Sequence, residues 1–420
     1  MSENMYIARS TDKSVPDVVP SGGVVTSILK CALESGLIEG VVAVRARSDD
    51  RLSGIPVLIS KPDELAGSAG SLHASIPNIP RFVKEYLDGA SSMKLAVVGK
   101  PCDIRAIIEL QKRQQIEREG LFLVGLNCSG TISPAEARRI FREELKVDPK
   151  DVVLEDIDEG KLTVFLKDGK SKSIDLGKLE EKGGGRRDNC RRCTTKIPTF
   201  ADLACGKWGT EEEEEGATFI EVSSEKGRKL LDNAVDKGCI ETKKPSKAAI
   251  ELRSKREEEE TQLSEEWRAR DFKPIMEMSL EERFEYWKHE FDKCIKCYGC
   301  RDACPICYCE DCLLEADREF LEAGVIPPNA LFPLTRLAHI ADSCVGCGQC
   351  QDACPMDIPL SKMFTLLSSR LSDVFEYVPG VDIEQGPPLS NAMTRELQID
   401  DTFLDIEAIM KKERGASKSG

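Results

Sequence analysis

The cysteines near the C-terminal end of the sequence form two runs with identical spacing. In each run, two residues separate the first three cysteines, three residues precede the fourth, and a proline follows it. The runs are Cys294, Cys297, Cys300 and Cys304, and Cys344, Cys347, Cys350 and Cys354. Bacterial-type ferredoxins hold a pair of [4Fe–4S] clusters with this spacing. We therefore predict two such clusters in this part of the chain.

The fourth cysteine of each run is expected to ligate the cluster of the other run, because it begins a segment that leads away from its own loop. The predicted ligand sets are therefore Cys294, Cys297 and Cys300 with Cys354, and Cys344, Cys347 and Cys350 with Cys304. A zinc ribbon would instead present paired CxxC knuckles without the terminal Cys-Pro. A disulfide scaffold is disfavoured because structural disulfides are rare in a reducing cytosol.

Three further cysteines lie between the two runs, at Cys307, Cys309 and Cys312. Their thiols could hold an additional metal, pack in the core or replace a ligand of a neighbouring cluster. A fourth donor is not evident beside them, so these interpretations stay open.

Four cysteines in the first half of the chain form another candidate metal site. Cys102 and Cys128 each follow directly on an apolar run that is typical of a buried strand. If these strands are parallel, both thiols emerge at the carboxyl edge of the sheet, where open α/β folds bind ligands. Together with the CxxC pair Cys190 and Cys193, they supply the four donors of a third [4Fe–4S] cluster. A redox-active CxxC is the alternative interpretation.

Two loops of small residues are candidates for binding a phosphate or another part of a cofactor. The first loop leads into a predicted helix, where free N–H groups and the helix dipole favour an anion, although a plain helix cap would look the same. Its candidate residues are Ser21, Gly22, Gly23 and Thr26. The second loop, AGSAGS, offers close backbone approach at Gly67, Gly70 and Ser71. Neither loop matches GxGxxG, and the sequence contains no GxxxxGK[ST], so no fingerprint supports NAD or ATP.

Apolar periodicity places these residues on an α/β framework. A buried strand is predicted at 40–44, and the apolar runs 94–99 and 121–126 each precede a helical pattern. Repeated strand–turn–helix units imply a largely parallel sheet. Short alternating strands at 152–176 predict a β-meander. Residues 241–270 are rich in Lys, Glu and Arg, which indicates a solvated linker or an exposed helix.

The composition excludes some classes of function. A net charge of -15 and an aromatic content of 5% argue against nucleic-acid binding, because a phosphate backbone would be repelled. No run of about 18 apolar residues is present, so no membrane span is expected. The N-terminal MSENMYIARSTDK lacks the apolar core of a signal peptide. We therefore expect a cytoplasmic protein.

Several segments together resemble the beta subunits of hydrogenases and formate dehydrogenases that reduce the deazaflavin coenzyme F-420 (also written F420). The resemblance rests on SGGVVTSIL, AGSAGSLH, VVGKPCDIRA, VGLNCSG, CRRC, ADLACGKWG and ATFIEV, in this order over about residues 5–240. It implies one FAD and one [4Fe–4S] cluster, with Cys102, Cys128, Cys190 and Cys193 as the ligands. Lys100 joins the candidate cofactor-binding residues. This chain departs from the family in having Lys100 where many members have Thr, and Asp103 where many have Gln.

The expected organisation follows from the motifs and the resemblance together. It consists of a mixed α/β (α+β) flavin and iron–sulfur domain over 1–245, a charged helical linker over 246–285, a bacterial-type 2[4Fe–4S] ferredoxin-like domain over 286–370, and a tail over 371–420. Within the family, a C-terminal dicluster module resembles the formate dehydrogenase beta subunit.

The resemblance also implies how such a chain works. A partner alpha subunit with a molybdenum or tungsten pterin oxidises formate, and the clusters pass the electrons to FAD, which transfers a hydride to coenzyme F-420. Arg191 and Arg192, beside the CxxC pair, are expected to influence cluster potentials. Two alternatives stay open: the same type of subunit serving a hydrogenase, or an adapter without flavin turnover that connects a dehydrogenase to a larger complex such as heterodisulfide reductase.

Overall fold

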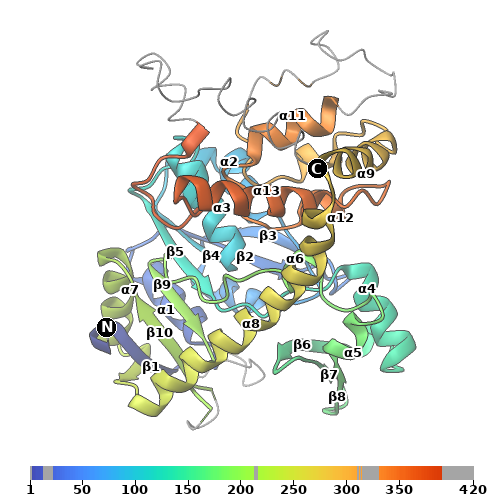
Figure 1. Cartoon of the computed structure of the whole chain (residues 1–420). Coiled ribbons are helices and arrows are strands. Elements are labelled where there is room, and N and C mark those ends of the chain that lie inside the picture. The colour runs from blue at the N-terminus through green and yellow to red at the C-terminus, as the bar shows by residue number, and fades with distance from the viewer. Residues whose placement is uncertain are drawn as a thin grey trace.

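The computed structural model describes residues 2–12, 22–211, 216–309, 312, 314 and 331–389. Its main body is an eight-stranded sheet with helices on both faces (Figure 1). From one edge to the other the strands are β11 (Ile240–Lys243), β1 (Met5–Ser10), β10 (Thr218–Val222), β9 (Leu203–Gly206), β5 (Leu121–Leu126), β4 (Leu95–Gly99), β2 (Gly40–Ala46) and β3 (Gly54–Ile59).

The centre of this sheet is parallel and its two sides are antiparallel. Strands β2, β4, β5 and β9 pair in parallel, whereas the pairings of β3, β10, β1 and β11 are antiparallel. The strands predicted from the three apolar runs are confirmed as β2, β4 and β5. The prediction of a largely parallel sheet holds only for the centre. An apolar run such as GIPVLI in β3 indicates a strand, but it does not indicate the direction in which that strand pairs.

Both faces of the central strands are largely buried, which explains why these strands are apolar at nearly every position, Arg45 near the end of β2 excepted. On one face, Val41, Ala96 and Val124 pack against α1 (Val24–Glu34) and α7 (Glu225–Asp236). Their neighbours in sequence point the other way, toward α2 (Ile79–Tyr86) and α3 (Pro101–Lys112).

The predicted β-meander is present as a separate three-stranded sheet. It consists of β6 (Val152–Asp158), β7 (Lys161–Leu166) and β8 (Ser171–Asp175), and its core includes residues of α4 (Pro134–Arg139) and α5 (Leu176–Glu180). Ser133 caps α4 by accepting a hydrogen bond from the backbone N–H of Glu136 at 3.2 Å. The Glu136 carboxylate binds Arg139 and the N–H of Gly185. The cap therefore has one of the two hydrogen bonds of a capping box.

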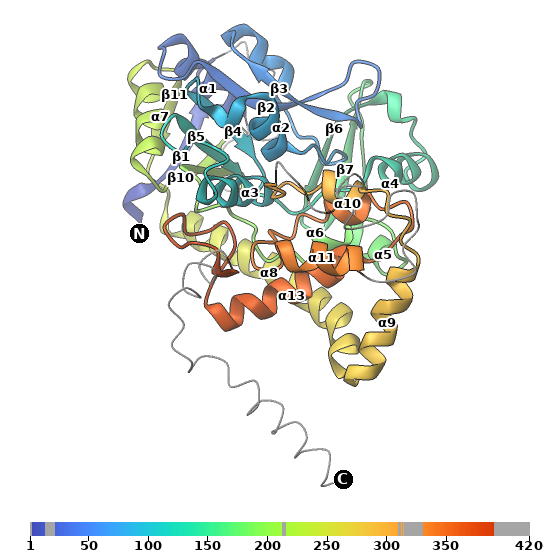
Figure 2. The same ribbon diagram turned by 90° about the horizontal axis from the view of Figure 1, so that it is seen from above.

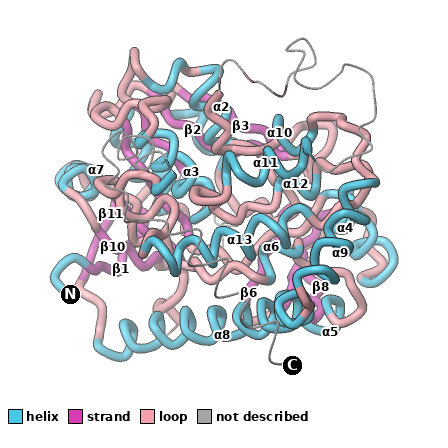
Figure 3. The backbone as a smooth tube through the Cα atoms, turned by 45° about the horizontal axis from the view of Figure 1, so that its top comes forward, coloured by secondary structure: helices cyan, strands magenta, loops and turns pink. Residues whose placement is uncertain are grey.

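The charged segment forms α8 (Lys247–Glu277), a helix of 31 residues that crosses one side of the molecule (Figure 3). Helical structure was one of the two predicted states, but this helix is more than a solvated linker. Arg253 forms an ion pair with Glu221 at 2.7 Å, and Asp271 binds Arg192. The helix thus fastens the CxxC segment to the main sheet. It is followed by α9 (Leu280–Asp292), which Ser279 and Glu282 cap as a complete capping box.

The C-terminal module packs against α3 of the main body (Figure 2). It contains the short helices α10 (Gly299–Asp302) and α12 (Gln349–Asp352) and the longer helices α11 (Leu331–Ile340) and α13 (Leu360–Phe375). Phe291, Ile340 and Phe364 share one core with Ala106 of α3. Beyond α13, the N–H of Gly380 donates to the buried carboxylate of Glu109 at 2.6 Å. No helix among the described residues is long and apolar enough to cross a membrane.

Candidate cofactor sites

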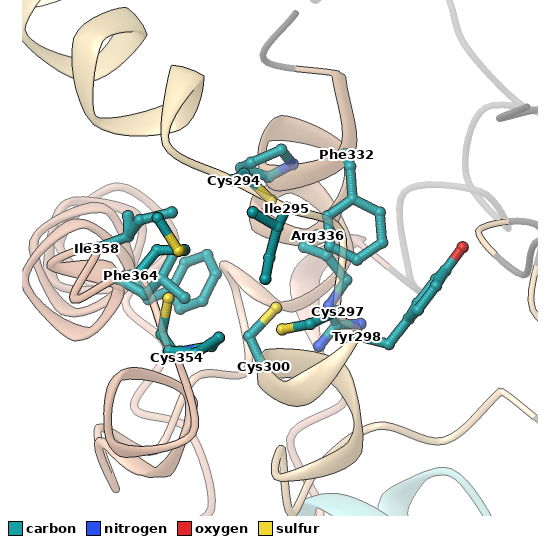
Figure 4. A pocket seen from close by; sticks show the side chains of 14 residues that line it. Cys294, Ile295, Cys297, Tyr298, Cys300, Phe332, Arg336, Cys354, Ile358 and Phe364 are labelled. Carbon is teal, nitrogen blue, oxygen red and sulfur yellow. The ribbon is translucent and has the colours of Figure 1, made fainter. Parts of the chain in front are cut away.

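The first ferredoxin run forms a small apolar cavity with the last cysteine of the second run. Cys294, Cys297, Cys300 and Cys354 all line it, and Figure 4 shows their sulfur atoms around one space. Phe364 and Ile358 lie on one side of this space, and Phe332 and Arg336 on the other. We call it the distal cavity.

The second run forms a matching cavity, which we call the middle cavity. Its lining includes Cys344, Cys347 and Cys350, together with Cys304 from the first run. The structure therefore brings together both exchanged sets of four thiols. The loops are close enough that a Cβ on Gly299 would lie 2.7 Å from the carbonyl oxygen of Ala353. Only glycine fits this crossing of the two runs.

The four remaining candidate ligands line a third cavity, which we call the inner cavity. Cys102 lies in the first turn of α3 and Cys128 follows β5, so both stand at the carboxyl edge of the parallel strands. Cys190 and Cys193 come from the short helix α6 (Asp188–Arg191) and the residues after it. The parallel pairing of β4 and β5 explains this convergence.

The charges around the inner cavity favour a thiolate at Cys190. Burial raises the pKa of this thiol, but the Arg187 guanidinium and a hydrogen bond from Thr131 outweigh burial and bring the pKa below its ordinary value. A thiolate is the form that ligates metal. Burial raises the pKa of the Cys128 thiol to about 12 and the pKa of the Cys102 thiol well above its ordinary value, so the lowered pKa is a property of Cys190 and not of the whole set. The set of four thiols fits an iron–sulfur cluster.

A single metal ion does not suit these thiols. Among the described residues, no three Cys, His, Asp or Glu side chains converge closely enough to hold one ion. Zinc draws its four ligands onto one centre, whereas each thiolate of a cubane binds a different iron. The three cysteines between the runs do not converge either. Cys307 accepts a hydrogen bond from Arg336 at 3.7 Å, Cys312 packs with Phe332, and Cys309 is exposed.

A fourth and larger cavity opens at the carboxyl edge of the main sheet, and we call it the edge cavity. Gly70, Ser71 and Lys100, three candidate cofactor-binding residues, line it. Both polar atoms of the Asn127 side chain are buried there without a hydrogen-bond partner, and so is the hydroxyl of Ser68. Buried polar atoms in this state are costly unless a ligand or water satisfies them. The cavity therefore fits a ligand with polar edges, such as a flavin.

The edge cavity also contains a charged group of three side chains, His73, Asp156 and Lys207. The Lys207 ammonium lies 2.5 Å from the Asp156 carboxylate, and His73 Nε2 lies 3.6 Å from it. Burial raises the pKa of Asp156, but the hydrogen bond from His73 and the charge of Lys207 outweigh burial and bring the pKa to about 2. Asp156 is therefore ionised at neutral pH and holds both neighbours in place.

The other candidate cofactor-binding residues lie elsewhere. Gly22, Gly23 and Thr26 stand at the start of α1 and do not line the edge cavity, and Ser21 lies outside the described residues. A Cβ on Gly22 would lie 1.8 Å from the carbonyl oxygen of Gly216, so this glycine is packed against backbone. Gly67 lies beside Arg45 and does not line the edge cavity.

Sequence analysis missed Asn127, His73, Asp156 and Lys207. Asn127 and His73 lie inside the motifs VGLNCSG and AGSAGSLH, so their positions carried a signal. Lys207 follows β9 and lies inside the motif ADLACGKWG, so its position carried a signal too. Asp156 sits on the meander outside these motifs, and nothing in its local sequence marks it as a neighbour of Lys207.

The four cavities form a series. The edge and inner cavities share Lys100, Cys128 and Thr131 in their walls. The inner and middle cavities share Asn189 and Cys347. The middle and distal cavities share Phe364 and exchange the fourth cysteines of their runs.

Comparison with protein families divides the chain in the same way. Residues 5–81 and 92–248 match the N-terminal and C-terminal parts of the coenzyme F420 hydrogenase/dehydrogenase beta subunit. Residues 290–358 match the 4Fe-4S dicluster domain. A chain of the F420-reducing [NiFe] hydrogenase complex from Methanosarcina barkeri has the same fold, with a TM-score of 0.56 at 22% identity over 64% of this chain and 91% of that chain.

Curated relatives extend the match to nearly the whole chain. The F420-dependent formate dehydrogenase subunit beta of Methanocaldococcus jannaschii is 44% identical over 92% of this chain and 98% of its own length. Subunit beta of formate dehydrogenase 1 from Methanococcus maripaludis is 41% identical over 93% and 99%. The coenzyme F420 hydrogenase subunit beta of Methanococcus voltae is 29% identical over 56% of this chain and 82% of its own. The chain therefore belongs to the coenzyme F420 hydrogenase/dehydrogenase beta-subunit family, in the branch of F420-dependent formate dehydrogenase beta subunits, and is an oxidoreductase component with a 4Fe-4S dicluster domain.

Proposed function

We propose that this chain carries electrons from formate oxidation in a partner subunit through three [4Fe–4S] clusters to FAD, and that coenzyme F-420 is reduced there by hydride transfer. The observation that carries the proposal is the serial arrangement of the distal, middle, inner and edge cavities. Three of them each contain a set of four candidate thiol ligands, and the fourth presents unsatisfied polar atoms. A bound FAD would supply the two-electron chemistry that connects single-electron clusters to a hydride acceptor.

The protein's own residues position the cofactors in this proposal. The thiolates of Cys102, Cys128, Cys190 and Cys193 would hold the inner cluster against the wall of the edge cavity. Lys100 and Asn127 would contact the flavin from the same wall. The partner would be an alpha subunit with a molybdenum or tungsten pterin, which docks on the module that holds the distal cluster.

The relatives favour formate over hydrogen as the electron source. The two formate dehydrogenase subunits match 92% and 93% of this chain, including the dicluster module. The hydrogenase subunit from Methanococcus voltae matches only 56%. The extra module is therefore what the formate dehydrogenase subunits share with this chain, and it gives the proposed electron path its entry. An adapter role toward heterodisulfide reductase has no observation of its own here.

The variant Cys102→Ala tests the proposal in the complex with the partner subunit. Loss of one inner thiolate should remove or impair the inner cluster, while the other two clusters remain. Formate oxidation with an artificial dye should persist because a dye can accept electrons upstream, and coenzyme F-420 reduction should collapse. Cys239→Ala, at a half-buried cysteine outside all four cavities, is the matched control. Full coenzyme F-420 reduction by Cys102→Ala in the absence of the inner cluster would overturn the proposed path.

A further inference from the structure

One arginine stands between the inner and the middle cavity. Arg187 directly precedes α6, and only 7% of its side chain is exposed. Its Nη1 lies 3.9 Å from the sulfur of Cys190, a candidate ligand of the inner cluster. Its Nη2 donates to the carbonyl oxygen of Cys347, a candidate ligand of the middle cluster, at 2.9 Å. One guanidinium therefore contacts both ligand sets.

The surroundings hold this guanidinium in place. Arg187 Nε donates to the carboxylate of Asp352 at 2.7 Å, and Nη1 lies 3.4 Å from the hydroxyl of Thr131. A Cβ on Gly348 would lie 2.9 Å from the Cβ of Asn189 and 3.2 Å from Nη2 of Arg187. Gly348 also has a φ of +75°, so both its conformation and the space around it require glycine. The loop of the second run is thus packed closely against Asn189 and Arg187.

The neighbouring arginines serve other contacts. Arg191 binds Asp188 and lies 4.7 Å from the Trp267 ring, and Arg192 binds Asp271. Neither lines any of the three thiol cavities, although both were expected from the sequence to influence cluster potentials. Arg105 also lies at the contact between the two parts of the chain, where it donates to the carbonyl oxygen of Val345.

We propose that Arg187 is a positioning residue that raises the reduction potentials of the inner and middle clusters together. Because both potentials rise, the difference between them stays small, and electron transfer between the two clusters stays near equilibrium. This inference rests on the proposed function, since it requires clusters in both cavities. Reduction adds negative charge to a cluster, and a buried cation nearby stabilises that charge with little screening by solvent. Asp352 opposes the cation, so the net effect depends on both charges.

Substitutions of Arg187 and Asp352 should shift the reduction potentials in opposite directions, because the two side chains carry opposite charges. In the anaerobically purified complex, potentiometric titration monitored by EPR would compare the wild type with Arg187→Met, Arg187→Lys and Asp352→Asn. Arg187→Met should lower the potentials of the inner and middle clusters and leave the distal one unchanged. Asp352→Asn should raise the same two potentials, and Arg187→Lys should retain most of the wild-type values. Arg191→Met, in the short helix that Arg187 precedes, is the control and should change none.

Several results would overturn the inference. Unchanged potentials in Arg187→Met with full iron content would do so, and so would equal shifts of all three clusters or the same shifts in Arg191→Met. If Arg187→Met loses iron, the test rests on Asp352→Asn alone. If the potentials of the inner and middle clusters do not rise in Asp352→Asn, the role of Arg187 is refuted. A wild-type complex without a third cluster signal would instead contradict the proposed function, so the two failures are distinguishable.

Discussion

The ammonium of Lys100 lies 2.7 Å from Oδ2 of Asp103, and the backbone N–H of Lys100 donates to the same oxygen at 3.0 Å. The carboxylate is buried and closes the N-terminus of α3, next to Cys102. These are the two positions at which the resemblance to the family implies a departure from Thr and Gln. The departures therefore compensate each other: the charge introduced at one position is paired by the charge at the other.

This pairing predicts strong coupling between the two positions. Lys100→Thr alone leaves a buried carboxylate without its cation, which should cost about 3–5 kcal/mol of stability. Changing Asp103→Gln as well should restore much of that loss, because no unpaired buried charge remains. A double-mutant cycle from thermal unfolding measures the coupling. Strictly additive effects of the two substitutions would show that the pair is not a unit.

The exchanged ligand sets predict which cysteines act on the same cluster. Fully loaded protein should contain about twelve iron atoms per chain, four for each of three clusters. Cys354→Ala should perturb the same EPR signal as Cys294→Ala, although Cys354 belongs to the other run. The signal of the middle cluster serves as an internal control. About eight irons in a fully loaded wild type would rule out the inner cluster.

The sequence predicted well those features that depend on local spacing. The thiols of each run are a few residues apart, and the strands β4 and β5 are short apolar runs that end shortly before Cys102 and Cys128. Such signals lie within one segment, so they can be interpreted without the fold. The same holds for the β-meander.

What the sequence did not predict depends on contacts between distant segments. His73, Asp156 and Lys207 come from three separate parts of the chain, and the role of Arg187 follows only from its contact with Cys347. The charged pattern of α8 suggested a solvated helix, because charged residues usually face water. The pattern cannot reveal that Arg253 of this helix pairs with Glu221 of the main sheet.

The charged group in the edge cavity gives a stability prediction with a defined pH range. The folded-state pKa of Asp156, about 2, lies below the unfolded value of about 3.9, so its contribution is complete above the unfolded value and disappears as the pH falls toward 2. Asp156→Asn should therefore lower stability by about 2 kcal/mol, typical of hydrogen bonds to a charged group. The difference in unfolding temperature from the wild type should be no smaller at pH 5.5 than at pH 7.5. A difference that shrinks at pH 5.5 would contradict this assignment.

The unsatisfied side chain of Asn127 predicts opposite effects on the empty and the flavin-loaded protein. Its amide donor and its carbonyl acceptor are both buried without partners, although its backbone N–H donates to Cys205 at 2.9 Å. If both side-chain groups bind the flavin, Asn127→Leu should weaken FAD binding by roughly 30- to 150-fold, since two hydrogen bonds contribute about 1–1.5 kcal/mol each.

The flavin-free protein should respond differently to this substitution. Leucine has a similar size and no polar atoms to desolvate, so Asn127→Leu should leave its unfolding temperature unchanged or higher. Quenching of FAD fluorescence measures affinity in protein with unchanged iron content, and thermal unfolding measures stability. Asn233→Leu, which removes a hydrogen bond with Ser35 on the outer helices, is the control and should not alter FAD affinity. If Asn127 were only a structural residue, its substitution would destabilise the flavin-free protein and leave the affinity for FAD intact.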